Sequence, residues 1–360
     1  MIKQHLKKLD WILIISVFLL VGMGLLSIYN SARGDFLNFK KQIIFFGIGF
    51  FLMILISFFD WRILREDPHL ILFFYFFCLI LLFGLFFFAP EIRGTKSWYN
   101  LGPISLDPAE FAKIALILLL AKYFTMRHIE MYRVIHILIS GFYLFLPSLL
   151  IFLQPDLGSV LIFISLWVGI LIISGIKLRH FLILILCGLL ILTFGWSKIL
   201  KEYQRERILS FIWPQISDPL KIGWSQRQAK IAIGSGRIFG QGIGRGGQTQ
   251  YGFLPEPQTD FIFSAIAEET GLIGASVLLF LFSVLIWRIF KIALESQSNF
   301  ARLFASGLGI LIISQVFIHI GMNIGILPII GIPLPFTSYG GSGLISAFLG
   351  LGILQSIKTH

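Results

Sequence analysis

The chain has 360 residues, of which 57% are hydrophobic and 38 are Phe, and its formal net charge is +11. Its mean hydropathy of +0.89 far exceeds that of a soluble globular domain. The composition excludes a soluble protein and indicates a polytopic membrane protein. Most of the positive charge follows membrane topology, so the sequence predicts no nucleic-acid partner.

Crossing a hydrocarbon core of about 30 Å takes roughly 17 to 25 apolar residues in a helix. Backbone groups in lipid must satisfy one another, so such runs are expected to be helical. The sequence contains ten of them, at 11–29, 42–59, 69–89, 108–124, 134–153, 157–175, 179–196, 261–287, 303–325 and 340–357.

The basic residues of the short loops set the orientation of these helices. Counted with the N-terminus on side one, most of them fall on side one. We therefore expect both termini in the cytoplasm and a long extracytoplasmic loop, 197–260, between helices 7 and 8. The predicted fold class is an all-α polytopic membrane protein of about ten transmembrane helices, with a single integral membrane domain over 1–360.

The second outer loop reads RGTKSWYNLGPISLDPAEFAK from Arg93 to Lys113. Pro108 suits a helix start, with Asp107 as its cap. Glu110 and Lys113 lie three residues apart on one face of that helix. The pair either fixes helix packing or leaves Lys113 lining a wet cavity that accepts an anion.

Between the fifth and sixth predicted helices, the outer turn is only QPDLGS, Gln154 to Ser159. Asp156 or Ser159 either caps the next helix or contacts a substrate. After Trp196 the long loop begins with KEYQRERILSFIWP, Lys201 to Pro214, which predicts an amphipathic helix lying in the membrane interface.

The glycine-rich stretch GSGRIFGQGIGRGG follows, from Gly234 to Gly247. It formally contains GxGxxG, but no strand precedes it, so it does not indicate a dinucleotide site. The glycines either pack the loop tightly across helix ends or let backbone amides approach a ligand. In the second case, Arg237 and Arg245 would supply positive charge for a phosphate.

The segment PEPQTDF brings Glu256 and Asp260 to the outer surface just before the eighth predicted helix. Either Thr259 or Asp260 is a possible cap for that helix. Glu268 and Glu269 lie two or three turns deeper. Charged residues inside a span usually face a cavity or a partner, which we expect of this pair.

The last outer segment, GILPIIGIPLPFTSYGGSG from Gly325 to Gly343, carries no charge but is broken by Pro and Gly. This combination predicts a loop that lines a cavity, and Ser338 is a candidate substrate-binding residue in it. On the helix leading to this loop, His319 and Asn323 are predicted to be buried hydrogen-bonding residues.

Four motifs, KSWYNLG with PAEFAK, QPDLGS, FLPEPQTDFIFSAIAEE and GIPLPFTSYGGSG, together resemble those of the SEDS family (shape, elongation, division and sporulation). The resemblance covers nearly the whole chain. The GIPLPF form is more similar to the elongation members than to the division members, where a Thr-Leu-Pro-Phe form is usual.

The resemblance implies a peptidoglycan glycosyltransferase that polymerises lipid II at the outer face of the bacterial cytoplasmic membrane during cell elongation and shape maintenance. It implies a class B penicillin-binding protein and the elongation machinery as partners. The essential aspartate of the family's TDF motif maps onto Asp260. Trp98 matches another position important to family function, and Glu110 and Lys113 match the family's intramembrane polar pair.

The chemistry agrees with this reading, because a polymerase outside the membrane has no ATP and needs a donor that carries its own leaving group. Asp260 is the candidate general base for the acceptor hydroxyl. A diphosphate leaves as an anion, so no general acid is needed, and direct displacement inverts the donor linkage. Lys113, Arg237, Arg245 or a divalent cation, Mg²⁺ or Mn²⁺, are candidates for meeting its charge. We expect no organic cofactor, and the sequence places no metal site.

Glu256 completes the candidate substrate-binding residues and is the fallback base with Glu110. Two other classes of function stay open. A lipid II flippase or transporter would also need a cavity with intramembrane polar residues, and a division-type or non-catalytic scaffold protein would tolerate loss of Asp260.

Overall fold

The structure is a computed structural model that describes residues 2–91, 95–102, 104–127, 134–198, 205, 209 and 222–360. Within these ranges the chain is mostly helical. The helices are α1 (Ile2–Lys8), α2 (Trp11–Asn30), α3 (Leu37–Ser57), α4 (Arg62–Glu66), α5 (Pro68–Phe88), α6 (Pro108–Arg127), α7 (Val134–Leu153), α8 (Leu157–Ile173), α9 (Leu178–Lys198), α11 (Ile222–Gly236), α12 (Gly247–Gln250), α13 (Ile262–Glu295), α14 (Asn299–Ile324) and α15 (Gly341–Thr359).

Each of the ten predicted runs coincides with one helix, which confirms the polytopic all-α class. Seven of these helices, α2, α3, α5, α7, α13, α14 and α15, are long and apolar enough to cross a membrane. The other three are α6, whose sequence includes Glu110 and Lys113, α8, which has 17 residues, and α9.

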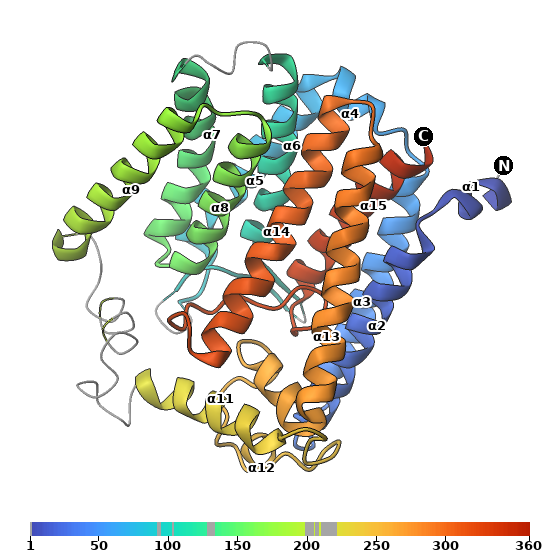
Figure 1. Cartoon of the computed structure of the whole chain (residues 1–360), viewed down its shortest axis with the longest axis vertical. Helices are drawn as coiled ribbons and strands as arrows, with labels where there is room; N and C mark the ends of the chain where they lie inside the picture. The colour runs from blue at the N-terminus through green and yellow to red at the C-terminus, as the bar shows by residue number, and fades with distance from the viewer. Residues whose placement is uncertain are drawn as a thin grey trace.

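The helices run side by side as one bundle (Figure 1). Both chain ends and α4 lie at one end of it, and α11 and α12 lie at the opposite end. This arrangement agrees with the orientation derived from the basic residues, so the α4 end is cytoplasmic and the α11 end is extracytoplasmic. In the core, α15 packs against α3, and α13 packs against both α14 and α2.

At the cytoplasmic end, Asp10 joins three helices. Its side chain is fully buried, and each carboxylate oxygen lies 3.0 Å from Nε of Arg288 on α13. The same carboxylate accepts from the backbone N–H of Leu13 and so caps α2. The Asp10 N–H donates to Gln355 of α15 at 2.9 Å.

The structure differs from the elements predicted from the sequence mainly on the extracytoplasmic side. A short antiparallel hairpin, β1 (Tyr99–Leu101) and β2 (Ile104–Leu106), lies in the second outer loop, where no strand was predicted. The long outer loop contains α11 and α12. The amphipathic helix predicted over 201–214 falls almost wholly outside the described residues.

The eighth predicted span is not one continuous helix. Gly271 has φ 69° and ψ −163°, which breaks α13 into a first segment, 262–270, and a longer second segment. A side chain at Gly271 would run into the Ile238 carbonyl oxygen and the Gly240 nitrogen. The break therefore lets the backbone of the outer loop lie directly against α13.

Candidate functional site

The loop between α14 and α15 folds back over the TDF segment at the extracytoplasmic end. The Ser338 hydroxyl donates to the Thr259 carbonyl at 2.8 Å, and the Tyr339 N–H donates to the Gln258 carbonyl at 2.8 Å. A methyl group added to Gly331 would lie 3.7 Å from Oδ2 of Asp260. The Asp260 carboxylate is therefore held against this loop.

The side chain of Asp260 does not begin a helix. The residue at the N-cap position of α13 is Phe261, which makes no side-chain capping bond. Neither Thr259 nor Asp260, the two possible caps considered from the sequence, therefore occupies the N-cap position. The capping oxygen comes instead from Asn323 of α14, which accepts from the Ser264 N–H at 3.2 Å.

Glu110 and Lys113 form a buried ion pair at the start of α6. Nζ of Lys113 lies 2.7 Å from Oε1 of Glu110, and the lysine side chain is only 2% exposed. A methyl group on Gly343 would lie 3.7 Å from the Glu110 carboxyl carbon. The pair therefore packs against the first turn of α15, directly after the loop that holds Asp260.

The predicted caps at two other helices are confirmed. Asp107 accepts from the Ala109 N–H at 2.9 Å, and its own N–H donates to the Ser342 hydroxyl at 2.8 Å. Asp156 caps α8 by accepting from the Ser159 N–H at 3.0 Å. Burial raises the pKa of Asp107 to about 8, and the nearby carboxylates of Glu110 and Asp156 add to the rise.

The QPDLGS turn, which contains Asp156, also lies at the extracytoplasmic site around Asp260. A methyl group on Gly158 would lie 2.7 Å from the Ile330 carbonyl oxygen, so this turn packs against the loop that holds Asp260. Segments from the second outer loop, the QPDLGS turn, the TDF segment and the last outer loop therefore meet at one extracytoplasmic site.

Two buried glutamates anchor the glycine-rich stretch. Glu268 accepts from the N–H groups of Gln248 and Thr249 at 2.7 and 3.0 Å. Glu269 accepts from the Asn30 amide at 2.8 Å and from the Gly244 N–H at 3.3 Å. Of the two expected alternatives, a cavity or a partner, the structure shows partners, because loop donors and Asn30 bond both carboxylates.

Gly236 and Gly240 also allow the glycine-rich stretch to pack closely against α13. A side chain at Gly236 or Gly240 would run into the carbonyl oxygens of Ala267 and Glu269 on α13. Of the two readings of the glycine-rich stretch, the structure favours tight packing across helix ends.

Arg237 and Arg245 are exposed on this stretch. The Arg237 carbonyl accepts from the Leu272 N–H at 2.9 Å, at the end of the first segment of α13. Asp260 lies at the start of that segment, which is about 13 Å long at 1.5 Å per residue. The structure therefore places Arg237 a segment length away from Asp260.

Glu256 and Trp98 belong to two of the segments that meet at the extracytoplasmic site, the TDF segment and the second outer loop. The Glu256 carbonyl accepts from the N–H groups of Thr259 and Phe261, both at 3.2 Å, and forms the turn that carries Asp260. Trp98 is partly buried and directly precedes β1.

Gln42 of α3 was not among the predicted site residues, yet it holds the last outer loop from the other side. Its amide donates to the Ser338 carbonyl at 3.1 Å and accepts from the Gly340 N–H at 3.2 Å. A single polar amide at the start of an apolar run was the signal that could have identified it. The prediction that His319 and Asn323 are buried hydrogen-bonding residues is confirmed.

Within the described ranges, no group of three or more His, Cys, Asp or Glu residues is arranged to hold a metal ion. Glu110 and Asp156 lie near enough to Asp107 to affect its charge, but Glu110 is paired with Lys113 and the other two carboxylates cap helices. The divalent cation considered above stays a prediction, and we derive no step through it.

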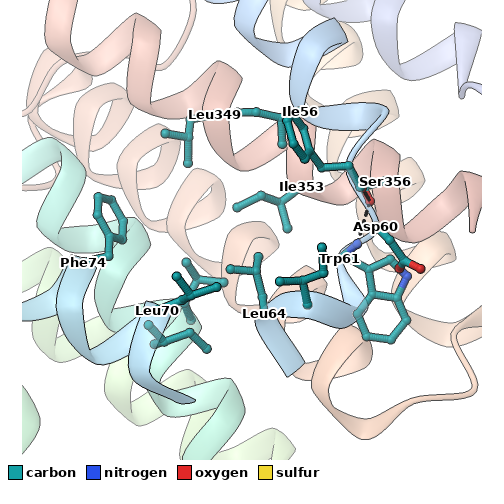
Figure 2. Close-up of a pocket in the computed structure, with 13 residues that line it drawn as sticks. Ile56, Asp60, Trp61, Leu64, Leu70, Phe74, Leu349, Ile353 and Ser356 are labelled. Atoms are coloured by element: carbon teal, nitrogen blue, oxygen red, sulfur yellow. Dashed lines mark hydrogen bonds between the residues drawn. The ribbon is translucent and has the colours of Figure 1, made fainter. Parts of the chain in front are cut away.

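A cavity of about 330 Å³ lies at the opposite, cytoplasmic end (Figure 2). Its walls come from α3, α4, α5, α6 and α15 and are mostly apolar, including Leu64, Leu70, Phe74 and Ile353. Asp60 is the one ionisable residue among the residues that line it. The cavity lacks the convergence of motifs seen around Asp260, so we place the candidate site at the extracytoplasmic end.

Comparison with known proteins gives a family match over residues 4–360, to the cell cycle protein family of FtsW, RodA and SpoVE. The chain is 35% identical over 353 residues to peptidoglycan glycosyltransferase MrdB of Escherichia coli K12, covering 98% of this chain and 94% of that one. It is 30% identical over 427 residues to peptidoglycan glycosyltransferase RodA of Treponema pallidum, covering 98% of each.

Solved structures agree. A chain from a peptidoglycan synthase complex, described as coordinating polymerization and crosslinking, matches with a TM-score of 0.83 and 32% identity over 97% of both chains. The rod shape determining protein RodA of Thermus thermophilus matches with a TM-score of 0.73 and 29% identity, covering 97% of this chain and 96% of that one.

Proposed function

Because the chain belongs to the SEDS family of FtsW, RodA and SpoVE, we propose that it is a peptidoglycan glycosyltransferase that polymerises lipid II with Asp260 as general base. It is a multi-pass protein of the bacterial cytoplasmic membrane. The observation that carries the proposal is the convergence of four outer segments around Asp260, at the membrane face where a lipid-linked sugar is exposed.

In the proposed reaction, the Asp260 carboxylate takes the proton of the acceptor sugar hydroxyl as its oxygen attacks the anomeric carbon of the donor. The bond between that carbon and the diphosphate oxygen breaks. The polyprenyl diphosphate leaves as an anion, and the donor linkage inverts from α to β. The reaction needs no second acid, because the leaving group is stable without a proton.

Lys113 is our candidate for meeting the diphosphate charge. Its partner Glu110 packs on Gly343 in the first turn of α15, five residues after Ser338, so the cation and the base contact adjacent parts of the chain. Arg237 and Arg245 lie on the glycine-rich stretch between α11 and α12 and remain candidates for other anionic parts of the substrates.

A class B penicillin-binding protein of the elongation machinery is the proposed partner, since it would crosslink the strands made here. The similarity to a chain of a complex that coordinates polymerization and crosslinking supports this. The names MrdB and RodA among the relatives support a role in elongation and cell shape.

The test is glycan-strand formation from purified lipid II by the wild-type chain and Asp260→Asn, with the partner present and its crosslinking blocked. Glu295→Gln, an acid-to-amide change on an exposed residue at the cytoplasmic end, is the matched control. We expect strands from the wild type and the control and none from folded Asp260→Asn. If all three proteins formed equal amounts of glycan strand, Asp260 would not be the base. No strands from the wild type would favour a flippase or scaffold.

A further inference from the structure

The last turn of α14 brings two buried polar side chains to the TDF segment. His319 and Asn323 are four residues apart, so they lie one above the other on the same helix face. Both are 0% exposed. A polar group buried this deeply is costly unless it is hydrogen-bonded, so its partners indicate its role.

The Asn323 amide uses its full bonding capacity. Its oxygen accepts from the Ser264 N–H at 3.2 Å and from the Ser264 hydroxyl at 2.6 Å. Its NH₂ group donates to the Asp260 carbonyl at 3.0 Å and to the His319 carbonyl at 2.8 Å. An amide turned the other way would set its NH₂ group against the Ser264 N–H, so the four partners fix its orientation.

These bonds join the start of α13 to Asp260. The Ser264 N–H belongs to the first turn of α13, where backbone donors lack partners within the helix. Asn323 accepts this N–H from a different helix, because Phe261 at the N-cap position makes no side-chain capping bond. One side chain therefore fixes both the first turn of α13 and the backbone of Asp260 to the same point on α14.

His319 fixes the opposite wall of the site to the same turn. Its Nδ1 donates to the Ile332 carbonyl at 2.8 Å. Ile332 follows Gly331, the residue against which Oδ2 of Asp260 lies. Two side chains one helical turn apart thus bond the backbone of Asp260 and the backbone of this loop to the same face of α14.

We infer that Asn323 is a positioning residue for the reaction, holding Asp260 at a fixed place in the site through its main chain. This rests on the proposed function, in which Asp260 is the base. A base works only within hydrogen-bond reach of the hydroxyl it deprotonates, and a displacement of about 1 Å can lower the rate roughly 100-fold.

The test compares Asn323→Asp with Ser264→Ala. The Asp side chain keeps an oxygen for Ser264 but loses the amide N–H that holds the Asp260 carbonyl. Ser264→Ala is the matched control, because it removes one bond of the same network and leaves the bond between Asn323 and Asp260 intact. Strand synthesis is measured against lipid II concentration with the full-length proteins and their partner, per folded molecule, together with the melting temperature.

We expect kcat of Asn323→Asp to fall about 10- to 100-fold with KM changed less than about threefold. Ser264→Ala should keep kcat within about twofold while its melting temperature falls. A residue with a purely structural role would lower the melting temperature and leave kcat per folded molecule unchanged. That result, or an equal loss of kcat in Ser264→Ala, would overturn the inference.

Asp260→Asn is measured in parallel. If it is inactive while Asn323→Asp keeps its kcat, the positioning role fails and the proposed base stands. If Asp260→Asn is active, both fail. If Asn323→Asp cannot be recovered as monodisperse protein, Asn323→Ser, which leaves room for a water molecule, is judged by the same kcat criterion.

Discussion

Replacing Glu268 with Gln should loosen the segment that carries Arg245. The Glu268 side chain is fully buried and accepts from the N–H groups of Gln248 and Thr249, at 2.7 and 3.0 Å, and from the Thr249 hydroxyl at 2.7 Å. Each carboxylate oxygen faces one backbone N–H. The amide of Gln must therefore turn its NH₂ group toward one of these donors.

The expected loss of free energy has two parts: the hydrogen bond that Glu268 no longer accepts, and the buried N–H that is left without an acceptor. A hydrogen bond to a charged group contributes about 1.5 to 3 kcal/mol, and a buried N–H without an acceptor costs about 1 to 3 kcal/mol. Together they weaken the attachment of the segment to α13 by about 3 to 5 kcal/mol. At about 1.4 kcal/mol per factor of ten, the open population rises roughly 100-fold or more.

Trypsin cleavage after Arg245 measures this opening, because that residue is exposed and lies in the anchored segment. When opening is fast relative to cleavage, the cleavage rate follows the population of the open form. Glu269→Gln should have a smaller effect, since its bond to the Gly244 N–H is long at 3.3 Å. Glu295→Gln, at the far end of α13, should have none.

A cleavage rate for Glu268→Gln within about threefold of wild type would refute the reasoning, because it would mean that the three bonds do not hold the segment closed. The same conclusion would follow if Glu269→Gln opened the segment more than Glu268→Gln.

Three further predictions concern stability, each read as a melting temperature in detergent. Arg288→Met leaves the buried Asp10 carboxylate without its cation and should cost about 3 to 5 kcal/mol, while the double variant with Asp10→Asn should recover part of the loss; no recovery would contradict the ion-pair account. Burial raises the pKa of Asp107 from 3.8 to about 8, so over that pH range the folded protein holds a proton that the unfolded chain has released, and stability falls as pH rises. The advantage of Asp107→Asn over wild type should therefore grow up to about pH 8 and then level off; an advantage independent of pH would count against the shift. Gly271→Ala should destabilise strongly, because its methyl group meets backbone atoms that cannot move aside, whereas Gly22→Ala, which has open space, should not.

The membrane architecture could be predicted from the sequence because each of its causes is local. A backbone in lipid must satisfy its own hydrogen bonds, so a long apolar run can only be a helix. The caps at Asp107 and Asp156 were predictable for the same reason, since each bonds an N–H two or three residues away. The family motifs also identified Asp260, Glu110 and Lys113 before any contact was known.

The sequence could not decide between readings that depend on distant partners. Thr259 and Asp260 were both reasonable caps for α13 by residue type, yet the cap comes from Asn323, about 60 residues later. Glu268 and Glu269 were expected to face a cavity or a partner, and nothing nearby in the chain shows that loop N–H groups are the partners. The break at Gly271 is also invisible locally, since an isolated Gly is tolerated in a helix.

The sequence by itself therefore determined the number, approximate bounds and orientation of the membrane helices and named candidate residues for the site, because lipid solvation and local capping act on neighbouring residues. Only the tertiary structure decided which of those residues meet. Asp260 is placed by the bond from Asn323 to its carbonyl, by the bond from Ser338 to the Thr259 carbonyl and by its position beside Gly331, and each of these partners lies more than fifty residues away in the chain. Such contacts depend on how the helices pack, which no local pattern encodes.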